Sequence, residues 1–165
     1  SNVVGEVEKY EEALKAALEN EKLIPVLLKE FPVKKETVVD NKYIIGALYG
    51  RLKKFPEAQQ YLLTALAIYK SQEGRDHEID RIYLDLAHIY EETGDKVRAR
   101  AYYTNSLEIR KKMSKAVADS GMEPIKEKIE ELKPQKKKKN EPTKPQPKKK
   151  DEKKGAKKKE EPKKK

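Results

Sequence analysis

The sequence predicts an all-α protein built of antiparallel helical hairpins and followed by a disordered basic tail. Three observations lead to this fold class. Apolar residues recur at three- and four-residue spacing up to residue 132, whereas strand-like alternation is rare. Glycine is scarce in the same part of the chain. A shift of 41 residues also places one helix–turn–helix pattern on the next, as in a repeat protein.

The apolar spacing predicts seven helices. They are expected at Val4–Asn20, Glu21–Phe31, Thr37–Leu52, Pro56–Gln72, Glu78–Thr93, Lys96–Ala118 and Pro124–Leu132. Pro25 fits the first turn of the second helix, where a missing N–H costs little, and Pro32 would end that helix. Gly94 fits a left-handed cap after the fifth helix, and Asp95 an N-cap of the sixth.

The last predicted helix is amphipathic and short. Ile125, Ile129 and Leu132 fall on one face, and charged residues fall elsewhere. Terminal repeats need such a polar outer face, so we expect residues 120–132 to cap the array. A docking element for another subunit is the alternative.

The 41-residue repeat carries both small and aromatic residues. The superimposed pairs are Tyr49 with Tyr90, Ala58 with Ala99, Tyr61 with Tyr102, Leu66 with Leu107 and Ile68 with Ile109. Gly46 falls on Ala87, and such small residues let neighbouring helices approach closely. Near the start, Tyr10–Ala13 echoes Phe55–Ala58, which indicates a degenerate earlier unit.

This pattern resembles the tetratricopeptide repeat. One unit reads Leu86-Ala87, Tyr90, Gly94, Ala99 and Tyr103, and the other reads Ile45-Gly46, Tyr49, Lys53 where the family usually has Gly, Phe55 and Ala58. The long spacing, the 107–110 sequence LEIR and the 74–77 sequence GRDH are similar to the repeats of kinesin light chains. The resemblance implies hairpins stacked as a short right-handed superhelix. It divides the chain into a degenerate helical pair (1–35), two hairpins (36–119), a capping helix (120–132) and the tail (133–165).

The resemblance also implies a concave groove lined by the first helix of each hairpin. The groove-facing residues would be Asp40, Tyr43, Ile44, Ala47 and Arg51 from one unit, and Arg81, Leu84, Asp85, His88 and Glu92 from the next. A partner protein could place an apolar anchor against Tyr43 and Ile44 and a basic group near Asp85. Some of these residues could instead pack against the seventh helix or the N-terminal pair. The family's carboxylate clamp is not expected, because only Arg81 is suitably basic.

The charge is divided unevenly along the chain. Residues 133–165 hold 17 lysines and 5 acidic residues, a net charge of +12, whereas the preceding 132 residues hold 22 basic and 24 acidic residues, a net charge of −2. With Ala156 as its only apolar residue, the tail cannot offset the entropy of ordering and should be disordered.

The tail predicts nonspecific attraction to a polyanion. Lysine is a point charge, and the tail has neither Arg nor aromatic residues for reading bases. The candidate contacts are the runs Lys136, Lys137, Lys138, Lys139 and Lys148, Lys149, Lys150. RNA, acidic tubulin tails and anionic surfaces remain open as partners, and so does a tail that only keeps the protein soluble.

Catalysis has little support in the sequence. Two histidines without ligand spacing make no zinc site, cysteine is absent, and no phosphate-binding glycine loop is present, so we expect no enzyme, metal or cofactor. No apolar run is long enough to span a membrane. We therefore expect a cytoplasmic, non-enzymatic adaptor, with nuclear or cytoskeletal placement as alternatives. An RNA-, ribosome- or microtubule-binding protein and a structural subunit of a large complex are the competing interpretations.

Overall fold

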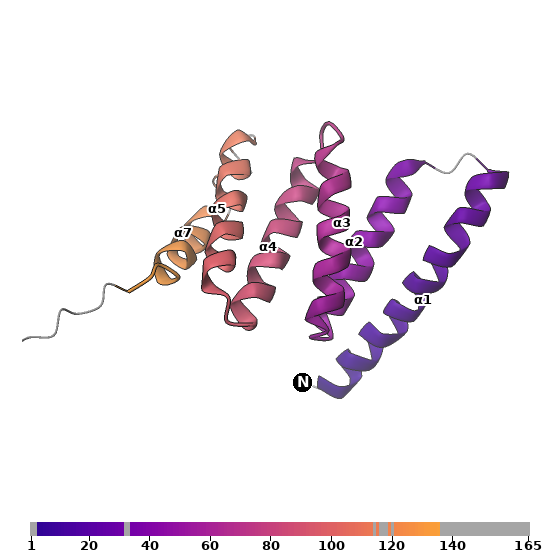
Figure 1. Cartoon of the computed structure of the whole chain (residues 1–165), viewed down its shortest axis with the longest axis horizontal. Helices are drawn as coiled ribbons and strands as arrows, with labels where there is room; N and C mark the ends of the chain where they lie inside the picture. The colour runs from indigo at the N-terminus through magenta and orange to yellow at the C-terminus, as the bar shows by residue number, and fades with distance from the viewer. Residues whose placement is uncertain (1–2, 32–33, 114, 116–118, 120, 136–165) are drawn as a thin grey trace, which may run out of the picture. The chain divides into compact units, whose positions relative to one another are not determined.

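The computed structural model describes residues 3–31, 34–113, 115, 119 and 121–135, and these contain six α-helices and no strand. The helices are α1 (Val3–Glu30), α2 (Lys35–Arg51), α3 (Phe55–Lys70), α4 (Asp76–Glu92), α5 (Lys96–Lys112) and α7 (Met122–Glu131). The chain divides after Pro134 into two units, of which the first is described below. Each helix of this unit packs mainly on its chain neighbours, which produces the row in Figure 1. The all-α prediction is confirmed.

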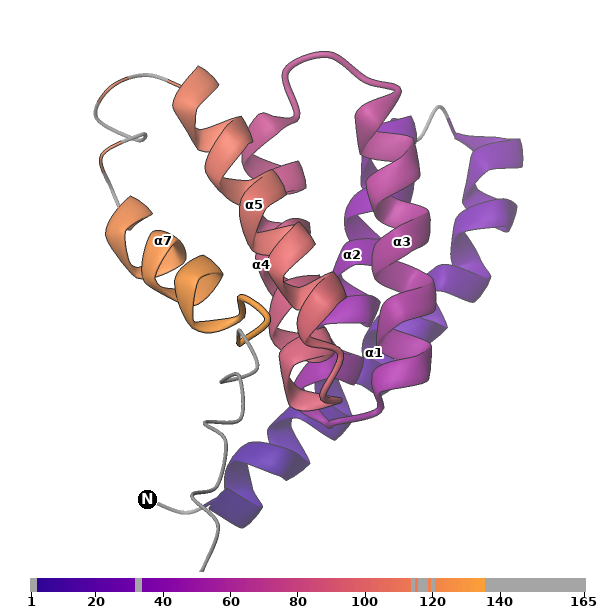
Figure 2. The same ribbon diagram turned by 60° about the vertical axis from the view of Figure 1, so that its left-hand side comes forward.

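Two hairpins, α2–α3 and α4–α5, form the centre of the row (Figure 2). Small residues allow the two helices of a hairpin to approach closely. Ala58 and Ala99 are completely buried, and a Cβ added to Gly46 would lie 2.9 Å from Leu62 Cγ. Leu62 and Leu86 are themselves fully buried in the core that runs through both hairpins. The repeat therefore specifies the packing within each hairpin.

Buried polar residues join particular helices. Asn41 of α2 donates a hydrogen bond to the carbonyl oxygen of Ala17 in α1 at 3.1 Å. Asp80 of α4 accepts hydrogen bonds from Ser106 at 2.5 Å and from Arg110 at 2.9 Å, both in α5. Because an unpaired polar group costs free energy when buried, these bonds fix the register between neighbouring helices.

The turns within the two hairpins contain the helix-ending and helix-capping residues that the sequence predicts. Gly94 has a φ of 83°, and the Asp95 side chain accepts a hydrogen bond from the Arg98 N–H at 3.0 Å, as expected for an N-cap. In the other hairpin Lys53 has a φ of 57°, a left-handed conformation that disfavours a residue with a Cβ. The chain thus adopts the same turn in both units, although one has Lys where the other has Gly.

The N-terminal region differs from the prediction. Residues 3–30 form the single helix α1, so the expected helical pair is wrong, and Pro25 lies inside that helix. Proline removes only one backbone hydrogen bond, and contacts on the N-terminal side of Pro25 hold the helix together. Ile24 is buried against the array, and Glu21 accepts hydrogen bonds from Lys42 at 3.0 Å and Tyr61 at 2.7 Å.

The C-terminal helices also have different bounds. α5 ends at Lys112, where Met113 turns to an extended conformation, rather than at residue 118. α7 begins at Met122 and buries Ile125, and its C-cap residue Leu132 is buried as well; α5 is the main neighbour of α7. Lys128 of α7 also forms a 2.8 Å ion pair with Glu91 of α4. The tail was predicted to be disordered, but its residues 136–165 lie outside the described residues.

None of the described helices is both long enough and apolar enough to cross a lipid bilayer.

Candidate functional site

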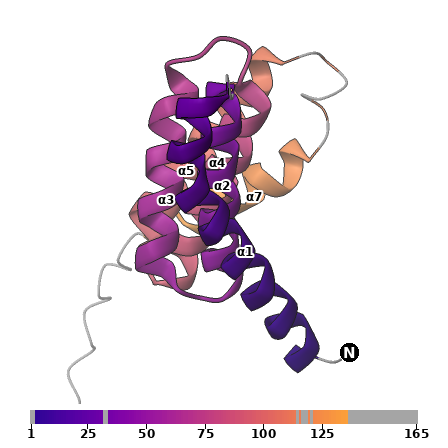
Figure 3. The ribbon, with the colours of Figure 1, turned by 90° about the vertical axis from the view of Figure 1, so that its right-hand side faces the viewer.

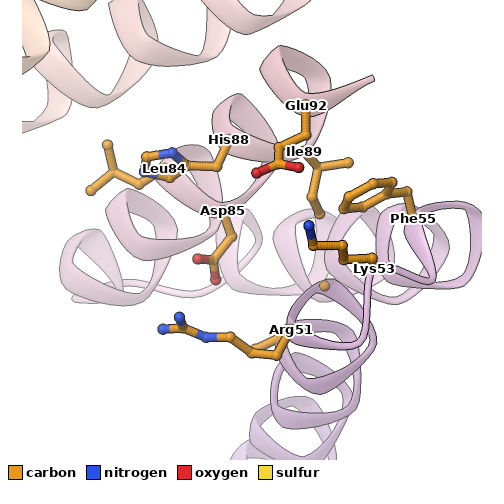
Figure 4. Close-up of a pocket in the computed structure, with 10 residues that line it drawn as sticks. Arg51, Lys53, Phe55, Leu84, Asp85, His88, Ile89 and Glu92 are labelled. Atoms are coloured by element: carbon orange, nitrogen blue, oxygen red, sulfur yellow. The ribbon is translucent and has the colours of Figure 1, made fainter. Parts of the chain in front are cut away.

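A cavity of about 510 Å³ opens between the C-terminal parts of α2 and α4 (Figure 4). Its lining consists of Ala47, Gly50, Arg51, Lys53, Phe55, Leu84, Asp85, His88, Ile89 and Glu92. The charged side chains come from α2, from α4 and, for Lys53, from the turn after α2, with Arg51 on α2 across from Asp85 on α4. Phe55 and Ile89 supply an apolar side. This combination of apolar contact and separate charges suits an extended peptide segment.

The structure brings together six of the ten predicted groove residues: Ala47, Arg51, Leu84, Asp85, His88 and Glu92. The other four, Asp40, Tyr43, Ile44 and Arg81, are not part of the cavity lining. Asp40 is used within the first hairpin, where its carboxylate accepts the hydroxyl hydrogen bond of Tyr69 at 2.5 Å. Ile44 is 47% exposed.

Tyr43 links the two hairpins across the predicted groove. Its hydroxyl group donates a 3.2 Å hydrogen bond to Asp85 Oδ2, so α2 and α4 are joined beside the cavity. Burial and the neighbouring Asp85 charge raise the pKa of Tyr43 to about 12, which keeps the hydroxyl protonated and able to donate.

Asp85 is a partly buried acid of the cavity lining. Burial raises the pKa of its carboxyl group, although the hydrogen bond from Tyr43 and the charges of His88, Arg51 and Arg81 oppose that shift. Desolvation makes the carboxylate a stronger attractor of an incoming cation than an exposed one. A ligand cation placed beside Asp85 would therefore gain more than one at the protein surface.

His88 lines the cavity and also contacts α5. Its Nδ1 lies 3.2 Å from the hydroxyl group of Tyr103, and that hydroxyl donates to Glu91 Oε2 at 2.8 Å. The contact with Tyr103 uses Nδ1 of the His88 ring and not Nε2. His88 is thus held by the packing of α5 as well as exposed to the cavity.

A second cavity, of about 380 Å³, continues past the first. It is lined by His88, Glu91, Glu92 and Lys128, so it shares two residues with the larger cavity and reaches α7. Hydrogen bonds from Lys128 and Tyr103 lower the pKa of Glu91, although its partial burial acts in the opposite direction. The helix predicted as a cap therefore also forms one wall of the groove.

Sequence reasoning missed Gly50, Lys53, Phe55 and Ile89 as lining residues. Lys53 and Phe55 were identified as repeat positions at the turn between α2 and α3, and the turn folds back to one end of the cavity. The sequence did contain one signal for Lys53, which stands where the repeat usually has Gly. A charged residue at a strained turn position suggests that its side chain has a function.

No group of three or more His, Asp or Glu side chains among the described residues could hold a metal ion. The lysines expected to contact a polyanion, Lys136–Lys139 and Lys148–Lys150, lie outside the described residues.

Comparison with known protein families agrees with this architecture. Residues 39–112, which span α2 to α5, match the family model described as tetratricopeptide repeat. This match supports tetratricopeptide repeats in residues 39–112, while the likeness to kinesin light chain repeats is not confirmed. Searches of curated proteins and of solved structures found no significant match.

Proposed function

We propose that the protein is a non-enzymatic adaptor that holds a peptide segment of a partner protein between α2 and α4. Tetratricopeptide repeats support a role in protein–protein interaction in general. The observation that carries the more specific proposal is the cavity itself, where apolar Phe55 and Ile89 lie beside the separate charges of Arg51 and Asp85.

The partner segment follows from those side chains. An apolar residue would pack on Phe55 and Ile89, and a Lys or Arg would lie beside Asp85, whose partial burial strengthens that contact. An acidic or hydrogen-bond-accepting group would face Arg51. This pattern differs from a clamp for a terminal carboxylate, which needs several cationic groups at one point.

A peptide-display selection on the full chain tests the groove. We expect the selected peptides to contain an apolar residue close to a Lys or Arg, and the variant Asp85→Arg to lose at least tenfold in affinity for them. The control is Glu73→Arg, which makes the same charge change at an exposed residue outside the cavity lining. Equal binding by Asp85→Arg and the wild-type chain would refute this site.

We further propose that the lysine-rich tail attaches the adaptor to a polyanion. Its net charge of +12 beside a nearly neutral body supports this. Binding of the full chain to polyuridylate RNA and to microtubules should weaken steeply with salt, and the chain cut after residue 132 should lose it. Binding that persists after that cut, or that resists roughly 0.3 M salt, would exclude the tail as the attachment.

A further inference from the structure

Lys53 has a strained backbone conformation in the turn between α2 and α3. Among the described residues it is the only non-glycine residue with a positive φ. The turns of the two hairpins lie at the same end of the row of helices (Figures 2 and 3). The Lys53 N–H donates to the carbonyl oxygen of Gly50 at 3.0 Å, and the Gly94 N–H donates in the same way to Glu91 at 3.1 Å. Both turns therefore need a left-handed residue, which Gly94 supplies without the strain that a Cβ adds at Lys53.

The Lys53 side chain is directed into the larger cavity. Figure 4 shows that it extends from the turn toward α4, beside Phe55. Within the described part of the chain, its ammonium group forms no hydrogen bond and no ion pair. A strained backbone position that carries an unpaired cation into a cavity suggests that the cation serves a ligand.

The two walls of this cavity carry opposite charges. Arg51 and Lys53 are cations on α2 and the turn after it, whereas Asp85 and Glu92 are anions on α4. Among the described residues no ion pair joins these cations to these anions, and the cavity of about 510 Å³ lies between them. Successive side chains of an extended segment point to opposite sides. A segment that turns a basic residue toward α4 therefore turns its next residue toward the cationic wall.

We propose that Lys53 is a specificity-determining residue that selects partner segments with an Asp or Glu one or three residues from the basic residue beside Asp85. This inference rests on the peptide groove proposed above. The odd separation follows from the alternation of side chains, since residues two apart face the same wall. The charge of Arg51 already acts on the Asp85 carboxyl group, whereas Lys53 has no such partner. Its ammonium group is a compact point charge that can meet a carboxylate from several directions.

Selection from a defined peptide library on the full chain tests this role. The probe is a displayed library of peptides about ten residues long, with one fixed central Arg and random residues elsewhere. The wild-type chain should enrich Asp and Glu about threefold more at the odd positions beside the Arg than two residues away. Attraction of acidic peptides to the lysine-rich tail raises all positions alike, so this comparison is independent of the tail.

Two charge reversals in the same turn show whether the preference comes from Lys53. Lys53→Glu should enrich Lys and Arg at the odd positions instead of Asp and Glu. The control Lys54→Glu makes the same charge change at the next residue, which is exposed and outside this cavity lining, and should select as the wild-type chain does.

Affinity and stability should change in opposite directions when the side chain is removed. Lys53→Gly and Lys53→Ala should each bind a peptide enriched by the wild-type chain about threefold more weakly, and Lys53→Arg should bind it within about twofold. Lys53→Gly should also raise the urea midpoint by roughly 0.5 M, because glycine relieves the strain. A merely structural role of Lys53 would not combine a more stable turn with weaker binding.

The outcomes separate this inference from the proposed groove. Equal enrichment of acidic residues at odd and even positions, or a Lys53→Glu chain that selects as the wild-type chain does, would overturn the role of Lys53. The groove itself would still stand if Asp85→Arg lost affinity for the same peptides. Undiminished binding by Asp85→Arg would refute the groove and this inference together.

Discussion

Replacing Gly46 and Gly50 by alanine should have opposite effects on stability, although both belong to α2. At Gly46 a Cβ would lie 2.9 Å from Leu62 Cγ and 3.0 Å from the Leu62 backbone nitrogen. Such overpacking typically costs about 1–3 kcal/mol, while the better helix propensity of alanine returns about 1 kcal/mol. We therefore expect Gly46→Ala to lower the free energy of unfolding by about 1 kcal/mol.

At Gly50 the nearest atoms to a new Cβ are Ile89 Cδ1 at 3.7 Å and Ala58 Cβ at 4.0 Å, which are ordinary contacts. Gly50→Ala should therefore raise the free energy of unfolding by up to about 1 kcal/mol. Urea denaturation followed by circular dichroism at about 222 nm measures both, and a gap of about 2 kcal/mol separates the midpoints by roughly 1 M. Equal stability of the two variants would refute the close α2–α3 packing at Gly46.

Three further outcomes follow from the local geometry. Lys53→Gly should raise the free energy of unfolding by about 1 kcal/mol, because its φ of 57° favours glycine, and Lys53→Ala should bring no such gain in the same urea titration. Glu21→Gln should be less stable than the wild-type chain at pH 7, because the folded pKa of Glu21, despite the opposing effect of burial, is lowered by Tyr61 and Lys42. The difference in stability between the two chains should be fully present above the ordinary Glu pKa of 4.5. It should shrink as the pH falls through the lowered pKa of folded Glu21, and urea midpoints at pH 7 and pH 3 measure it. Ile125→Ala should cost about 2–4 kcal/mol of packing at α7, and hydrogen exchange should then quicken in α7 while α2 and α3 keep their protection.

The elements that could be predicted from the sequence are those with local causes. Gly94 and Asp95 mark the end of one helix and the start of the next through backbone conformation and a side-chain cap, which depend only on neighbouring residues. The continuity of α1 through Pro25 was not predictable in this way, because Lys42 of α2 and Tyr61 of α3 hold Glu21 in place.

The residues of the candidate site also differ in whether local sequence could predict them. Asp85 and His88 follow from helical spacing within α4, as the repeat pattern implied. Phe55 joins the cavity because the turn between α2 and α3 comes close to the end of α4, a distance in space that no spacing along the chain encodes. The wall formed by Lys128 was missed for the same reason, since it depends on how α7 lies against α4 and α5.

The hydrogen bond between Tyr43 and Asp85 has a mechanical consequence. Each hairpin is stiff, because its two helices share a dense apolar core and buried bonds such as Asp80 with Ser106, whereas the packing between the hairpins is sparser. A bend between the two hairpins should therefore cost less free energy than a distortion within either hairpin. The hydrogen bond between Tyr43 and Asp85 opposes that bend. A peptide segment bound beside Asp85 would break the hydrogen bond between Tyr43 and Asp85. Binding of the segment and bending between the two hairpins would then be coupled, so a change in one would change the free energy of the other.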